Sequence, residues 1–127
     1  MSDAIDAGVL TVFDPGAVSS LTGHLDDREF AIVFVTRYRR MLPERVRRIL
    51  AALRDGDADE AMDAVLSLKV SASTVGAGEL FELGGRIEGH LRRCDITGAV
   101  LAAGELAAAA VRVDRALTAW LELRLDA

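Results

Sequence analysis

The sequence predicts an all-α protein, an up-and-down antiparallel four-helix bundle with one or two accessory N-terminal helices. Apolar residues recur at spacings of three and four along most of the 127 residues. Signals that begin and end helices divide the chain, and the connections of two to five residues make neighbouring helices antiparallel. The length is that of one domain, residues 1–127, with its core at about 13–123.

The first half of the chain carries three predicted helices. Asp14 followed by Pro15 predicts a short helix over 15–21, and Asp26 with Glu29 forms an acidic capping box that opens a second. Pro43 predicts a new, third helix that ends before Asp55-Gly56-Asp57. The expected buried face of the second helix is Phe30, Val33, Phe34, Tyr38 and Met41, and that of the third is Val46, Ile49, Leu50 and Leu53.

The second half carries three more. A fourth helix is expected from Asp57 to about Val75, where Gly76 is a natural left-handed terminator. A fifth, over 77–94, contains three glycines whose expected use is close approach to a neighbour: Gly84, Gly85 and Gly89. The last is expected over 97–123. The predicted core stripes are Ala58, Ala61, Val65, Leu68, Ala72 and Val75, then Leu80, Leu83, Ile87, Leu91 and Cys94, then Ala99, Ala103, Leu106, Ala110, Val113, Leu117 and Trp120.

Composition and charge exclude several classes of function. A net charge of −5 disfavours nucleic acid as a partner, because phosphate binding needs a basic surface. A single cysteine, Cys94, forms no internal disulfide, and His24 and His90 lie too far apart for a zinc motif, so we expect no metal and no cofactor. No run of apolar residues is long enough to span a membrane, and the acidic start is unlike a signal peptide, so we expect a cytoplasmic protein.

Charge is distributed unevenly along the chain. Residues 37–54 contain seven arginines and one acid, Glu44, whereas residues 55–63 contain five acids and no base. The first interpretation is a set of solvated helix faces with ion pairs between successive turns. The alternative is that the arginines steer an acidic protein partner.

One motif carries a resemblance to a known family. Residues 66–77 are Leu-Ser-Leu-Lys-Val-Ser-Ala-Ser-Thr-Val-Gly-Ala, followed by Leu80 and the pair Ile87-Glu88. This resembles the histidine phosphotransfer (HPt) domain of bacterial phosphorelays, whose signature is His-x-Leu-Lys-Gly-Ser, then Gly-Ala, a leucine and a Leu-Glu pair. The resemblance extends over roughly residues 13–120. It implies a helical bundle that exchanges phosphoryl groups with receiver domains.

The sequence departs from the family at the reacting residue. The alignment places Leu66 at the phosphoacceptor histidine and Val70 at the glycine that follows the lysine, here Lys69. A phosphoacceptor needs a nitrogen lone pair, which leucine lacks, and Lys69 alone supplies only a point charge. We therefore expect no enzymatic activity and no phosphotransfer through this position.

The same helix is expected to present a protein-binding surface. At 100° per residue, Leu66 lies roughly 120° and Val70 roughly 160° from the centre of the core stripe, so both should face solvent. The predicted surface is Leu66, Lys69, Val70, Ser73, Asp63 and Asp59. The resemblance implies a response-regulator receiver domain or a histidine kinase as the partner. The other interpretations of the apolar pair are drift after loss of the histidine, or cover by an extra helix.

Two other functions remain as alternatives. His90, with Arg93 three residues on, has a His-x-x-basic spacing and could accept phosphate, although a boundary histidine near a helix end is the simpler interpretation. The bundle could instead self-associate with no role in a relay. His24 is expected in a capping loop, and Cys94 and Trp120 are expected in the core.

Overall fold

The computed structural model describes residues 11–22 and 28–125, and in these ranges the regular structure is entirely helical. The helices are α2 (Pro15–Thr22), α3 (Arg28–Arg54), α4 (Ala58–Val75), α5 (Gly78–Arg92), α6 (Ile96–Ala103) and α7 (Leu106–Leu125). The predicted all-α class is confirmed.

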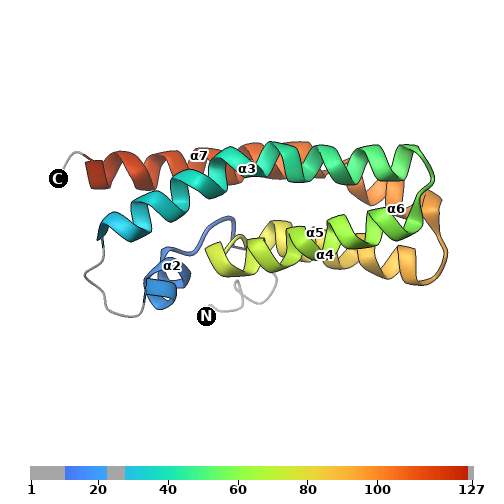
Figure 1. Cartoon of the computed structure of the whole chain (residues 1–127), viewed down its shortest axis with the longest axis horizontal. Helices are drawn as coiled ribbons and strands as arrows, with labels where there is room; N and C mark the ends of the chain where they lie inside the picture. The colour runs from blue at the N-terminus through green and yellow to red at the C-terminus, as the bar shows by residue number, and fades with distance from the viewer. Residues whose placement is uncertain (1–10, 23–27, 126–127) are drawn as a thin grey trace, which may run out of the picture.

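Four helical rods form the bundle (Figure 1). The long α3 runs beside α7, and α4 and α5 lie together below them. The fourth rod is α6 and α7 together, with α6 packed against α5. The short α2 is the accessory helix, and it packs against α4 and α3 at one end of the bundle.

The predicted break at Pro43 is wrong. Helix α3 passes through the proline without interruption and is 27 residues long in all. Its buried residues keep one phase on both sides of it: Val35, Tyr38, Leu42, Val46, Ile49 and Leu53. Proline removes a hydrogen bond and crowds the preceding turn. The continuous apolar face outweighs that cost, and the helix bends instead of ending (Figure 1).

The predicted buried faces in this part of the chain were partly wrong. Phe30, Val33 and Met41 are each close to half exposed, and Leu50 is also exposed. The prediction gave the segments before and after Pro43 separate buried faces. Because α3 is one continuous helix, it has a single buried face, and Val35 and Leu42 lie on the same face as the buried residues after Pro43. Asp26, the expected cap, lies outside the described residues.

Both ends of α4 form as predicted. The Asp57 side chain accepts a hydrogen bond from the Glu60 backbone N–H at 3.1 Å, and Gly76 ends the helix at φ 78°. A Cβ atom on Gly76 would lie 2.7 Å from the Asp14 carbonyl oxygen, so glycine is also required for packing. The core stripe is buried as expected except for Ala58, which is exposed because it begins the helix.

The last two connections differ in detail from the prediction. Helix α5 ends at Arg92, and Cys94 is exposed in the turn at φ 59° rather than buried in the core. The expected final helix is divided at Gly104 and Glu105. There the backbone N–H groups of both residues donate to carbonyl oxygens three residues earlier. Its seam is buried as predicted apart from Ala110, which is partly buried. The expectation that no segment is long and apolar enough to cross a membrane is wrong for residues 96–125, which meet that test by length and composition and form the fourth rod of the bundle.

We expect Pro43→Ala to stabilise the protein by about 1–3 kcal/mol, because alanine restores the hydrogen bond and relieves the crowding in an exposed turn. Chemical denaturation of both proteins measures this difference. A loss of stability would show that the bend at Pro43 is needed for packing.

Candidate protein-binding surface and the groove beside it

The solvent face of α4 carries five of the six predicted binding residues. Leu66 is 38% exposed and Val70 is 66% exposed, one turn apart. The exposed residues of this face are spaced by four and three along the helix: Asp59, Asp63, Leu66, Val70 and Ser73. The structure thus places an aliphatic pair between polar neighbours, and Leu66 faces outward rather than into the core.

Lys69, the sixth residue, points instead to α5. Its Nζ lies 2.6 Å from Glu88 Oε1 and 5.2 Å from the centre of the Phe81 ring. The other oxygen of Glu88 accepts hydrogen bonds from Arg92. The hydrogen bond from Lys69, and then that from Arg92, holds the pKa of Glu88 below its usual range. The charge of Lys69 is therefore neutralised within the bundle.

Close packing of α4 on α5 makes this ion pair possible. Gly84 faces Lys69, and a Cβ atom at that position would lie 2.6 Å from Lys69 Cγ. A Cβ atom on Gly85 would meet nothing within 4 Å. Of the three glycines for which the sequence predicted close approach, only Gly84 thus provides it to a neighbouring helix.

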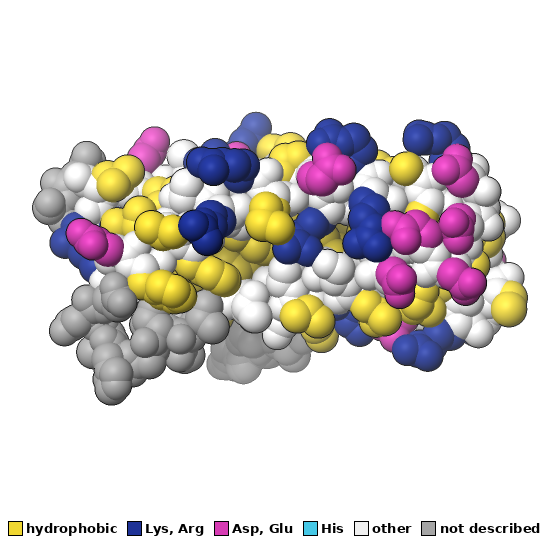
Figure 2. All heavy atoms as spheres, in the orientation of Figure 1, with side chains coloured by type: hydrophobic (Ala, Val, Ile, Leu, Met, Phe, Trp, Pro, Cys, Tyr) yellow, Lys and Arg dark blue, Asp and Glu magenta, His cyan; other side chains and the backbone are white. Residues whose placement is uncertain are grey.

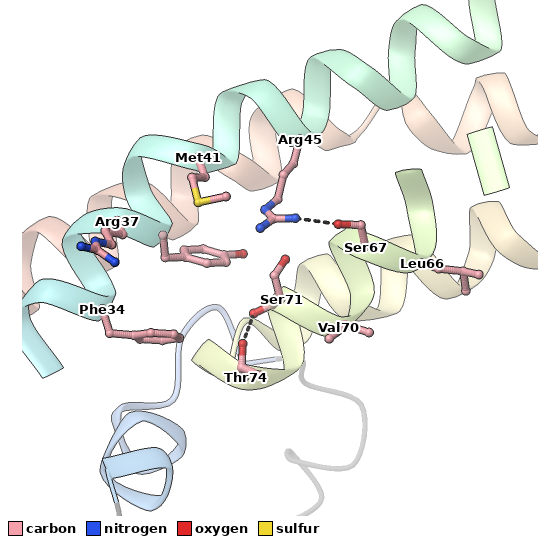
Figure 3. A pocket seen from close by; sticks show the side chains of 10 residues that line it. Phe34, Arg37, Met41, Arg45, Leu66, Ser67, Val70, Ser71 and Thr74 are labelled. Atoms are coloured by element: carbon pink, nitrogen blue, oxygen red, sulfur yellow. Dashed lines mark hydrogen bonds between the residues drawn. The ribbon is translucent and has the colours of Figure 1, made fainter. Parts of the chain in front are cut away.

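On its other flank α4 borders a groove that sequence reasoning missed (Figure 3). The groove lies between α3 and α4 and has a volume of about 640 Å³. Its lining residues are Phe34, Arg37, Tyr38, Met41, Arg45, Leu66, Ser67, Val70, Ser71 and Thr74. Ser67 and Ser71 point toward α3, Thr74 turns back onto its own helix, and Leu66 and Val70 stand at the outer edge. The groove therefore borders the exposed aliphatic pair.

Two polar atoms at this groove are buried without a hydrogen-bond partner among the described residues. They are the hydroxyl oxygen of Tyr38 and Nε of Arg45. An unsatisfied buried polar group costs about 1–3 kcal/mol. Burial raises the pKa of Tyr38 to about 12, against the opposing effects of the Arg45 charge and the Ser71 hydroxyl. No sequence signal pointed to these atoms, because they come together only when α3 packs on α4.

The arginines of α3 divide into paired and unpaired groups. Three form ion pairs: Arg39 with Asp114 at 2.7 Å, Arg47 with Glu44 at 2.7 Å and Arg48 with Glu60 at 2.5 Å. In the part of the chain that the structure describes, Arg37 and Arg45 have no ion pair, and both line the groove. Figure 2 shows basic side chains along α3 and acidic ones gathered where α3 passes into α4. The groove is therefore locally cationic.

His90 lies at the corner between α5 and α6. Its Nδ1 is 2.9 Å from Asp95 Oδ2 and 3.2 Å from Arg93 Nη2. Asp95 also caps α6 by accepting from the Gly98 backbone N–H, and this bond, followed by that to His90, lowers the pKa of Asp95. The arrangement fits a structural role for His90 in the turn.

The remaining candidates take simple positions. Trp120 is buried and meets Phe13 edge to face at 6.2 Å, as expected for a core residue. His24 lies outside the described residues. Within the described ranges, no three histidine, cysteine or acidic residues gather closely enough to hold a metal ion.

Comparison with known proteins identifies the class of fold. No known protein family matches the sequence, and no curated protein matches it either. Among solved structures, the chain is similar to the HPT domain of the Hpt sensor hybrid histidine kinase from Shewanella. The TM-score is 0.73 at 19% identity, over 88% of this chain and 95% of that one. The chain therefore has the fold of an HPt domain, as the sequence resemblance predicted.

We expect Gly84→Ala and Gly85→Ala to differ in stability by about 1 kcal/mol or more. Alanine favours a helix by up to about 1 kcal/mol, and Gly85→Ala should gain this because its Cβ is unobstructed. In Gly84→Ala the Cβ displaces Lys69 from Glu88 and cancels the gain. Denaturant unfolding compares the two. Equal stabilisation would show that Lys69 moves aside for the added Cβ atom without any loss of unfolding free energy.

Proposed function

We propose that this chain is a non-catalytic HPt-like module that binds a cytoplasmic protein of a two-component or phosphorelay pathway, either a receiver domain or a histidine kinase. The observation that carries the proposal is the exposed side chain of Leu66 on α4, at the position that the sequence alignment assigns to the phosphoacceptor histidine. The site keeps a surface for recognition and has no group to phosphorylate there.

The chemistry of the neighbouring residues supports loss of phosphotransfer. The aliphatic side chain of Leu66 has no lone pair with which to attack an aspartyl phosphate. Lys69, which would neutralise a bound phosphoryl group, is held by Glu88 at 2.6 Å. Val70 adds bulk beside the position where the group would sit.

The surface itself supports protein binding. Leu66 and Val70 supply apolar area that a partner would bury, and Asp59, Asp63 and Ser73 form a polar margin along the same face. Apolar burial would provide most of the affinity, whereas the charges would set the orientation and the association rate.

We expect no acid-labile, alkali-stable phosphoryl label on the native protein after incubation with phosphorylated receiver domains from the source organism. The double variant Leu66→His/Val70→Gly should gain such a label, because it restores both a nitrogen nucleophile and access to it. A label on the native chain that disappears in His90→Gln would instead show that His90 relays phosphate. This result would overturn the proposal.

We expect Leu66→Asp to weaken binding to a receiver domain or histidine kinase at least about tenfold, because a charge replaces an exposed aliphatic side chain that the partner would bury. Leu101→Asp is the matched control, since Leu101 is 73% exposed on α6, a helix outside the surface. Surface plasmon resonance against a panel of these partners measures both. Equal weakening by the two variants would reject the surface.

The same pair of variants tests self-association. Light scattering gives the oligomeric state of the native chain, Leu66→Asp and Leu101→Asp. If the native chain forms an oligomer and Leu66→Asp alone dissociates it, the apolar pair is an interface between copies, and the role assigned here to a pathway partner fails.

A further inference from the structure

The groove between α3 and α4 has chemistry that protein docking on Leu66 does not use. It contains two arginine side chains and no acidic one among its ten lining residues. Arg45 donates through Nη1 to the Ser67 hydroxyl at 2.6 Å, while its Nε has no partner in the described structure. Arg37 stands exposed farther along the same helix. Such a groove is complementary to an anion.

The hydroxyl groups show where the anion would bind. Ser71 and Thr74 already donate to backbone carbonyls, those of Leu68 and Ser71, at 3.1 and 2.8 Å. The Ser67 hydroxyl accepts from Arg45 and keeps its own proton available. The Tyr38 side chain is 5% exposed, and its hydroxyl makes no hydrogen bond of good geometry among the described residues, although the Ser71 hydroxyl is close enough to lower its pKa. The free donors thus gather around Arg45.

The rest of the groove is apolar. Phe34 and Met41 reach from α3 toward α4, and Val70 stands at the outer edge (Figure 3). A volume of about 640 Å³ is in the usual range for small-molecule sites, which combine apolar walls with a few polar groups. Methionine adapts its shape to an apolar guest. The space therefore suits a molecule with an anionic head and a hydrocarbon body.

We propose that this groove binds a small amphipathic carboxylate, a free medium-chain acid whose head group is held by Arg45, Ser67 and Tyr38 and whose chain lies against Phe34 and Met41. The carboxylate accepts charge-assisted hydrogen bonds from the guanidinium and gives the buried hydroxyl of Tyr38 the acceptor that it lacks. Because the Tyr38 hydroxyl and Arg45 Nε are both buried, the proposal requires the Arg45 side chain to move when the ligand binds. The proposal does not rest on the docking surface proposed above, although Leu66 and Val70 belong to both.

Decanoate, kept below its micellar concentration, is the probe. The chain has a single tyrosine, so selective labelling of tyrosine with carbon-13 gives one NMR reporter in the groove. We expect decanoate to shift the Tyr38 signal in a saturable way, and decyltrimethylammonium, which has the same chain and the opposite charge, to leave it unchanged. Absence of a shift with decanoate, or an equal response to both probes, would overturn the proposal.

Calorimetric titration of variants locates the head group. Arg45→Gln should weaken decanoate binding about tenfold or more, and Tyr38→Phe about fivefold. Arg40→Gln removes the same charge from an exposed position on α3 outside the groove, and it should bind as the native chain does. Circular dichroism checks that each variant is folded. If Arg40→Gln loses as much affinity as Arg45→Gln, binding depends on overall charge and the site is rejected.

Discussion

Burial of one stripe of α4 sets the angular position of each side chain on which the candidate surface depends. Five residues of this stripe have no exposed area: Ala61, Val65, Leu68, Ala72 and Val75. With α3 on one flank and α5 on the other, any rotation of α4 would expose these residues and bury polar ones. Leu66 and Val70 therefore face solvent, Ser67 faces α3 and Lys69 faces α5.

The two flanks of α4 differ in how their polar groups are satisfied. Toward α5, Lys69, Glu88 and Arg92 form a compact network in which each charge has an opposite partner. Toward α3, Tyr38 and Arg45 retain buried atoms without partners beside an open groove. Unsatisfied polar atoms are rare in folded proteins because they cost stability. A ligand therefore finds unsatisfied polar groups on the α3 flank, where Ser67 and Ser71 of the motif line the groove, whereas Lys69 of the same motif is neutralised on the α5 flank.

The HPt-like fold of this chain does not depend on a nucleophile at position 66. The bundle depends on apolar periodicity and on caps such as those at Asp57 and Gly76, none of which requires a histidine on the solvent face. The fold can thus persist while the chemistry at its surface changes.

Local signals allowed accurate prediction wherever they agreed with the packing. The limits of α4 followed from Asp57 and Gly76, because capping involves residues only a few positions apart. The break expected at Pro43 was wrong because a long-range apolar face outweighed a local preference. Cys94 was misplaced since the turn after α5 begins two residues earlier than periodicity alone suggested.

The helical class, the phase of α4 and the absence of a nitrogen at position 66 can all be predicted from residue order, since each depends on side-chain type and on spacing within one helix. In contrast, which charges are neutralised and where a groove opens become known only when the packed helices are seen together. Lys69 meets Glu88 across 19 positions, Arg45 meets Ser67 across 22 and Arg39 meets Asp114 across 75. Such pairings depend on how helices pack against one another, and no local pattern encodes them.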